Sequence, residues 1–282
     1  MTGLVRTVRR SPALAAGTVM LALVSAGAVL APGIAPDDPR AISPTSLDPP
    51  SSGHLLGTND AGSDILSRLI WGSRTSLVVA ACATALVLAI ALVVGLIAGL
   101  RGGWVDIVVM RVTDVFLALP VVPLLIFIAA LVTPALGLSI LLIGLLTWPE
   151  TARIVRSQTL SLRNRGFIRS ARGFGAGPLY VMRRHLIPAL GPLIVVNLVQ
   201  IAGVVIGIEA GLAFLGLGDP SAVSWGQELE RALSHQSILI SSTWVWWLLP
   251  SGLALGYTLF SLLLIGIGLE PWFNPRTSRA RR

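Results

Sequence analysis

Six apolar segments, each close to the length needed to cross a bilayer, constrain the fold of this chain more than any other feature. They cover residues 13–32, 76–100, 107–132, 135–152, 189–216 and 244–268. A helix needs about 20 apolar residues to cross roughly 30 Å of hydrocarbon. Its backbone polar groups must also be satisfied within the helix, since lipid offers no partners. The segments therefore predict an all-α polytopic membrane protein with six transmembrane helices.

The first segment follows Arg6, Arg9 and Arg10, an arrangement that it shares with cleaved signal peptides. Its apolar part is longer than a typical signal core, so we expect a retained helix.

The predicted spans divide the chain into three parts. Residues 1–75 hold an N-terminal cytoplasmic tail, the first transmembrane helix and an extracytoplasmic loop. Residues 76–270 hold a five-helix transmembrane core with a cytoplasmic loop at 153–188, and residues 271–282 form a basic cytoplasmic tail.

Arginine distribution predicts the orientation, because basic residues in short loops stay on the cytoplasmic side of a membrane. With the N-terminus inside, only four arginines fall outside: Arg40, Arg68, Arg74 and Arg231. This layout places both termini in the cytoplasm. It also accounts for the net charge of +8, so the basic balance does not call for a nucleic-acid partner.

Several chemistries find no support in the residue types. All 21 basic residues are arginine, and a phosphate-binding loop of the G-x-x-x-x-G-K-[ST] type needs a lysine. Any ATP would therefore be hydrolysed by another chain, and we expect no catalytic site here. The lone Cys82 and the three histidines, His54, His185 and His235, show no ligand spacing. We expect no bound metal and no cofactor.

Residues 153–188 stay out of the membrane in this layout and include an amphipathic helical element. Arg165, Arg169 and Arg172 share one stripe of a helical wheel. The opposite side carries apolar residues: Phe167, Ile168, Ala171 and Phe174. Such a helix suits docking into the groove of a soluble partner. Equally, its arginines suit a role limited to topology and contact with anionic lipid. Composition and spacing leave the two interpretations open.

The order of residues in this element resembles the loop by which permease subunits of ABC importers contact their ATPases. That pattern is E-A-A, three residues, G, nine residues, then I-x-L-P. Here it falls on Arg169, Ser170, Ala171, Gly175 and residues 185–188, with Ala171, Gly175 and Pro188 matching. The resemblance implies that the following residues couple the chain to an ATPase: Arg165, Arg169, Ser170, Ala171, Arg172, Phe174, Gly175 and Pro188.

One departure matters physically, because Arg169 stands where the family has an acid. The charge offered to the ATPase is thereby reversed. Gly175 should resist replacement, since a residue just past a helix end often adopts a left-handed conformation.

Three longer stretches resemble the C-type permeases of dipeptide and oligopeptide importers: residues 55–77, 102–126 and 209–229. The resemblance implies a type I ABC importer permease fold that forms half of a pore for dipeptides or oligopeptides. It also implies a homologous B-type permease, two ATPase subunits that carry ATP and Mg, and an extracytoplasmic peptide-binding protein. The location implied is the bacterial plasma (inner) membrane.

Two carboxylates stand within predicted spans, where such groups are costly unless they face water or a partner. We expect Glu209 near the outer mouth of a substrate path, or alternatively in an ion pair with Arg74 or the partner permease. Asp114 is a second path residue, for which we expect a local charge pair with Arg111 and Arg101. A docking surface for the binding protein is expected on outer-loop residues: Asp60, Asp64, Arg68, Asp219 and Glu228.

Small residues four apart predict closely packed helices. They are Gly95 with Gly99, Gly203 with Gly207 and Gly211, and Gly252 with Gly256.

Other functions compete with a peptide importer. A nickel or other small-solute importer has similar permeases. An ATP-independent transporter would show internal repeats, and a membrane enzyme would show a catalytic pattern such as H-E-x-x-H.

Overall fold

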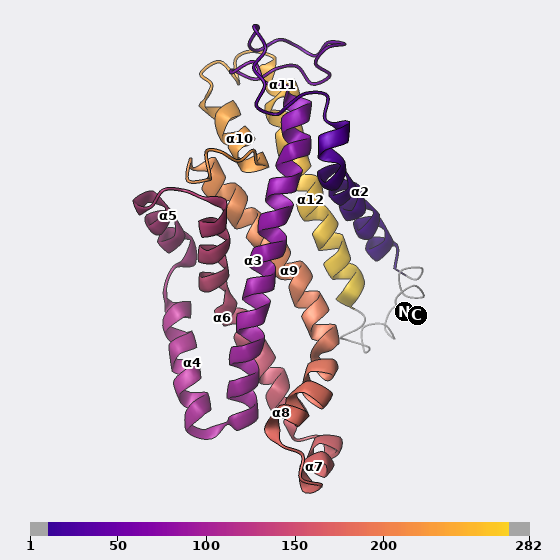
Figure 1. Ribbon diagram of the computed structural model, residues 1–282, viewed down its shortest axis with the longest axis vertical. Coiled ribbons are helices and arrows are strands. Elements are labelled where there is room, and N and C mark those ends of the chain that lie inside the picture. The colour runs from indigo at the N-terminus through magenta and orange to yellow at the C-terminus, as the bar shows by residue number, and fades with distance from the viewer. Residues whose placement is uncertain (1–10, 271–282) are drawn as a thin grey trace.

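A computed structural model describes residues 11–270, and helices dominate this part of the chain (Figure 1). In order they are α2 (Pro12–Ile34), α3 (Ile65–Arg101), α4 (Gly103–Ala118), α5 (Val121–Leu131), α6 (Leu136–Arg163), α7 (Gly166–Gly173), α8 (Pro178–Val181), a π-helical turn (Met182–Leu186), α9 (Ile187–Phe214), α10 (Trp225–Ser234), α11 (Thr243–Trp246) and α12 (Leu248–Leu269). The two basic tails lie outside the described residues.

Within residues 11–270, five helices are long and apolar enough to cross a membrane. They are Pro12–Ile34, Ile65–Arg101, Leu136–Arg163, Pro178–Phe214 and Thr243–Leu269. The number rises to six if the bent pair α4 and α5 counts as one span. The all-α polytopic fold predicted from the apolar segments is therefore confirmed.

The span predicted at 107–132 is not one continuous helix but the bent pair α4 and α5. The axes of α4 and α5 differ by 75° at the break between them. Leu119 there is extended (φ −81°, ψ 132°) and precedes Pro120. Proline disfavours the helical conformation in the residue before it and offers no N–H to the preceding turn. With 11 residues, α5 is about 16 Å long, too short to cross a bilayer by itself.

Two helices extend well beyond their predicted spans. α3 has 37 residues, which makes it about 55 Å long, and it begins at Ile65 rather than near residue 76. The side chain of Asp64 accepts a hydrogen bond from the Ser67 amide (2.7 Å) and so caps this start. α6 continues to Arg163. The first third of the expected loop at 153–188 is therefore helix.

Glycines allow α3 to pack closely on α6. A Cβ atom on Gly95 would lie 2.7 Å from the Ala152 carbonyl oxygen, and one on Gly99 would lie 2.7 Å from the Thr159 Cβ. Close approach at this pair is therefore confirmed. Added Cβ atoms at Gly203, Gly207 and Gly211 would meet nothing within 4 Å in residues 11–270, so the expectation fails there within this chain.

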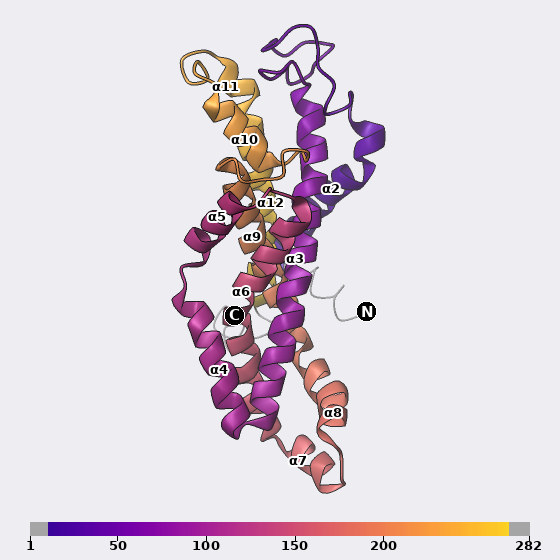
Figure 2. The same ribbon diagram turned by 60° about the vertical axis from the view of Figure 1, so that its left-hand side comes forward.

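The bundle is elongated, with distinct elements at its two ends (Figures 1 and 2). α7 and α8 project at one end, here called the α7 end. The opposite end, here called the α10 end, carries α10, α11 and the loop of residues 35–64 between α2 and α3. α4 runs along the outside of the bundle, beside α3 and α6 (Figure 2).

Candidate functional site

α7 is fixed to the tip of the bundle by one side chain. Ile168 is fully buried and packs in a cluster with five other apolar residues: Leu96, Val155, Val181, Leu186 and Leu190. The cluster draws on α3, α6, α8, the π turn and α9. Through Ile168, α7 is thus packed against residues of three long helices.

The end of α7 has the hydrogen bonds of a Schellman motif. The Ala176 amide donates to the Ala171 carbonyl (3.0 Å), and the Gly175 amide donates to the Arg172 carbonyl (2.9 Å). Gly175 has φ +84°, a left-handed conformation that costs a residue with a Cβ roughly 1 kcal/mol. The left-handed geometry expected at Gly175 is confirmed.

The solvent-facing side of α7 differs from the helical-wheel prediction. Arg165, Arg169, Ser170 and Arg172 are exposed, but so are two of the residues assigned to the buried side. Phe167 is 47% exposed and Phe174 is 93% exposed. The reason is that α7 ends at Gly173, so Phe174 leaves the helical wheel and projects from the helix end. Of the predicted apolar side, Ile168 alone is buried and Ala171 is half-buried.

Pro188 lies apart from α7, in the first turn of α9. The π turn immediately before it is wider than an α turn. This local widening accommodates the proline ring, which would otherwise conflict with the carbonyl of Arg184. Pro188 therefore shapes the start of α9, where it is exposed.

Two ion pairs join α4 to α6. Asp114 Oδ1 accepts a hydrogen bond from Arg153 Nη2 at 2.5 Å, so the pairing expected with Arg111 and Arg101 is wrong. Asp106 forms a bidentate pair with Arg156, whose Nε and Nη2 lie 2.5 and 2.6 Å from its carboxylate oxygens. The second pair was not predicted, because partners 50 residues apart become visible only once α4 lies antiparallel to α6.

Glu209 is buried on α9, where its Oε2 accepts a hydrogen bond from Ser76 Oγ of α3 at 3.1 Å. The expected pairing with Arg74 is wrong, since the guanidinium of Arg74 instead lies 5.6 Å from the ring centroid of Trp71. Glu209 lines a small cavity of ≈ 20 Å³ together with Ser139, Ser224 and Gln227. Such a space holds one water molecule. The carboxylate faces this small recess near the α10 end.

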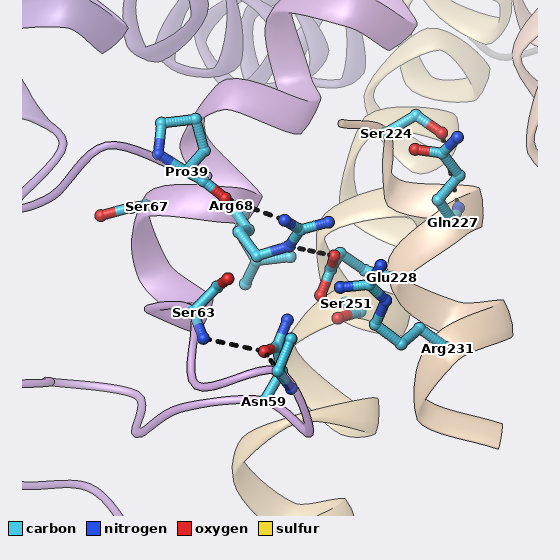
Figure 3. A network of polar contacts seen from close by, with 12 residues as sticks. Pro39, Asn59, Ser63, Ser67, Arg68, Ser224, Gln227, Glu228, Arg231 and Ser251 are labelled. Carbon is cyan, nitrogen blue, oxygen red and sulfur yellow. Dashed lines mark hydrogen bonds and ion pairs between the residues drawn. The ribbon is translucent and has the colours of Figure 1, made fainter. Parts of the chain in front are cut away.

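A buried ion pair connects α3 with α10 (Figure 3). Arg68 donates from Nε to Glu228, and its Nη1 donates to the Pro39 carbonyl at 2.8 Å. The indole Nε1 of Trp247 donates to the second oxygen of Glu228 at 3.3 Å. Breaking a buried pair by removing one partner costs about 3–5 kcal/mol. This network therefore holds the loop of residues 35–64 on the bundle.

The burial of this network corrects the docking surface expected at the α10 end. Asp64, Arg68 and Glu228 are buried, so their side chains offer no contact to a binding protein. Asp60 is exposed, with its Oδ1 3.9 Å from Arg231 Nε, and Asp219 is half-buried. Of the five predicted docking residues, these two remain accessible.

Asp219 caps α6 from a distant loop. Its Oδ2 accepts from the Leu136 amide at 3.0 Å, while its Oδ1 accepts from the amide and hydroxyl of Ser221 at 2.8 and 2.6 Å. The Ser221 hydroxyl, followed by the backbone N–H groups, lowers the pKa of Asp219 below its usual value. Ala135, at the N-cap position, offers no side-chain acceptor.

One cluster was missed entirely by sequence reasoning, which predicted no metal ligands. Asp37, His54 and Asp64 present one nitrogen and two carboxylate oxygens that all lie within 4.8 Å of one another. Spacings of 17 and 10 residues in an irregular loop carry no recognisable pattern. The folded loop alone brings these groups together.

Comparison with known proteins places this architecture in a family. Residues 91–279 match the family described as the binding-protein-dependent transport system inner membrane component. The chain belongs to this family. The resemblance to ABC importer permeases drawn from the sequence is thereby confirmed, and the protein is a multi-pass component of the inner membrane.

Several relatives of this binding-protein-dependent family cover most of the chain. A putative peptide permease of Brucella suis is 37% identical over 229 residues, covering 80% of this chain and 74% of the relative. The dipeptide transport system permease of Bacillus subtilis is 30% identical, with 97% and 85% covered. A probable peptide ABC transporter permease of Sinorhizobium fredii is 34% identical, with 98% and 94% covered.

Proposed function

We propose that this chain is the permease subunit of an ATP-driven peptide importer. It forms half of the pore for dipeptides or oligopeptides and couples through α7 to ATPase subunits on separate chains. The names of the relatives support the peptide cargo. The exposed face of α7 supports the coupling, and Phe174 is the observation that carries it.

Phe174 is 93% exposed at the end of a helix that projects from the bundle. A large aromatic side chain held in water gains free energy when a partner covers it, and such residues dominate many interfaces. Arg165, Arg169 and Arg172 of the same segment are also exposed and carry positive charge. The partner surface is accordingly a groove with an apolar floor and acidic walls. Since Arg169 stands where the family has an acid, this ATPase carries the complementary charge.

The buried Ile168 supports a role for α7 in transmitting motion. Because its cluster joins α7 to α3, α6 and α9, closure of the ATPases would shift these spans relative to one another. The chain itself is non-catalytic in this scheme and binds no cofactor, while ATP and Mg reside on the ATPases. Glu209 and Asp114 are the ionisable candidates for the substrate path.

Membership of the family supports the remaining partners. They are a homologous B-type permease, two ATP-binding-cassette subunits and an extracytoplasmic peptide-binding protein that meets the α10 end near Asp60 and Asp219. Both termini are cytoplasmic in this arrangement, as is α7. Of the described arginines, ten lie toward the α7 end, which agrees with the positive-inside rule: Arg101, Arg111, Arg153, Arg156, Arg163, Arg165, Arg169, Arg172, Arg183 and Arg184.

Uptake of a labelled dipeptide tests the proposal in a strain that lacks this chain and other dipeptide importers. We expect uptake to return with the wild-type chain and to disappear when ATP is depleted. Phe174→Ala should reduce both uptake and the amount of ATPase that copurifies. Phe127→Ala, at an exposed phenylalanine of α5, is the matched control and should retain both.

Each part of the proposal would be contradicted by a different result. Restored uptake that survives ATP depletion would contradict coupling to an ATPase. Dipeptide uptake that is unchanged by deletion would contradict the peptide cargo, and labelled nickel would then be the next solute to test. Full copurification of the ATPase with Phe174→Ala would show that α7 docks through other residues.

A further inference from the structure

Three side chains at the α10 end converge from separate parts of one loop. Asp37 follows the end of α2, His54 lies midway along the loop, and Asp64 caps the start of α3. The Nδ1 atom of His54 lies 3.1 Å from Asp64 Oδ1 and 3.7 Å from Asp37 Oδ2. One imidazole nitrogen therefore faces two carboxylates.

These separations match the edges of a metal coordination shell. Zinc binds histidine nitrogen and carboxylate oxygen at about 2.0–2.2 Å, with tetrahedral geometry. Two ligands of a tetrahedral ion are then about 3.3–3.5 Å apart. The separations of 3.1 and 3.7 Å from the His54 nitrogen bracket this distance, and all three ligand atoms lie within 4.8 Å of one another. Side-chain movements that bring the three separations to this distance would place an ion between the three atoms.

The charge of the cluster also calls for a cation. Within residues 11–270, neither Asp37 nor Asp64 pairs with an arginine, although two arginines lie nearby in the chain. Arg68 is engaged by Glu228 and the Pro39 carbonyl, and Arg40 Nη2 donates to the Ser221 carbonyl at 2.7 Å. The Asp64 side chain is completely buried. Two carboxylates this close, one of them buried, are stabilised by a bound positive ion.

The ligand atoms are held in place by their surroundings. Oδ2 of Asp64 accepts from the Ser67 amide at 2.7 Å, which leaves Oδ1 directed at His54. The Asp37 amide donates to Ser67 Oγ at 2.9 Å, and the His54 amide donates to Ser51 Oγ at 3.2 Å. Such supporting contacts orient metal ligands before the ion arrives.

We propose that Asp37, His54 and Asp64 form a binding site for a divalent transition-metal ion, with Zn²⁺ as the best match. A mixed imidazole and carboxylate set suits Zn²⁺ and related ions, whereas Ca²⁺ and Mg²⁺ prefer shells of oxygen alone. With three protein ligands, the fourth position is left for water. The ion joins the end of α2 to the start of α3 and closes the loop between them, which stabilises that arrangement.

Zinc titration of the full-length chain in detergent tests the site, with an affinity tag that contains no histidine. We expect one ion to bind per chain by isothermal titration calorimetry and the melting temperature to rise with Zn²⁺. Co²⁺ should bind with the visible absorption of a tetrahedral site. His54→Ala and Asp37→Asn should each weaken Zn²⁺ binding by roughly tenfold or more and abolish the thermal shift.

Matched variants distinguish this site from nonspecific binding. His235→Ala removes a histidine from the other loop at the α10 end, and Asp38→Asn removes the neighbouring acid, so both should bind Zn²⁺ as the wild type does. Asp64 is left unchanged because it also caps α3. The proposal is overturned if Zn²⁺ fails to bind the wild type, if His54→Ala binds it equally well, or if Mg²⁺ produces the same thermal shift.

Discussion

Asp219 shows how one side chain secures the α10 end. It supplies the acceptor that Ala135 cannot offer at the start of α6, and it orders the turn around Ser221. Loss of a capping carboxylate costs about 0.5–2 kcal/mol. We therefore expect Asp219→Ala to lower the melting temperature of the detergent-solubilised chain. Asp60→Ala, which removes an exposed acid with a single pairing at 3.9 Å, should leave it nearly unchanged, and an equal loss would contradict the capping role.

The same residue has a predictable response to pH. Hydrogen bonds lower the pKa of Asp219 in the folded chain, so its stabilising contribution is complete above the ordinary value of about 3.9. The contribution is lost as the pH falls below that value and through the folded pKa. In melts below pH 4, the difference between the wild type and Asp219→Ala should therefore shrink. A difference that grows on acidification would show that the cap does not depend on the carboxylate.

At the scale of elements, the close contact between α3 and α6 leaves no room for a side chain at two glycines of α3. A methyl group on Gly95 would lie 2.7 Å from both the Ala152 carbonyl oxygen and the Val155 Cβ. Since neither neighbour can move without shifting α6, Gly95→Ala should destabilise the chain by about 1–3 kcal/mol. Gly207→Ala makes the same change in open space on α9 and should cost nothing in the isolated chain. Comparable melting temperatures for both variants would contradict this packing.

Local properties explain which elements could be predicted from sequence. Hydropathy located α2, α9 and α12 within a few residues, because a membrane span is defined by its own composition. The proline at position 120 is also a local signal for a helix break, but the continuous apolar residues around it led to the prediction of one span. Partners such as Asp106 with Arg156 depend on how α4 lies against α6, and the cluster around His54 depends on the course of a 30-residue loop. Neither follows from spacing along the chain.

At the scale of the whole molecule, buried polar contacts hold one end together, and the other end carries a short exposed helix. Buried contacts of Arg68, Glu228 and Asp219 secure the α10 end. At the α7 end, Ile168 is the one fully buried side chain of a short helix whose remaining residues are exposed apart from the half-buried Ala171. This asymmetry suits a protein that receives solute at a rigid α10 end and is moved by a partner that contacts α7.

Cysteine labelling tests that asymmetry as a statement about membrane sides. Cys82 is the only cysteine in the chain, so Cys82→Ala provides a background without thiols. In that background, Gln236→Cys at the α10 end should react with a membrane-impermeant maleimide in intact cells whose outer barrier, where present, has been opened. Ser170→Cys on α7 should react only after the inner membrane is permeabilised. Both positions are exposed in the fold, so a difference in labelling reports sidedness rather than burial. Reaction of Ser170→Cys in sealed cells would reverse the orientation and separate α7 from any cytoplasmic ATPase.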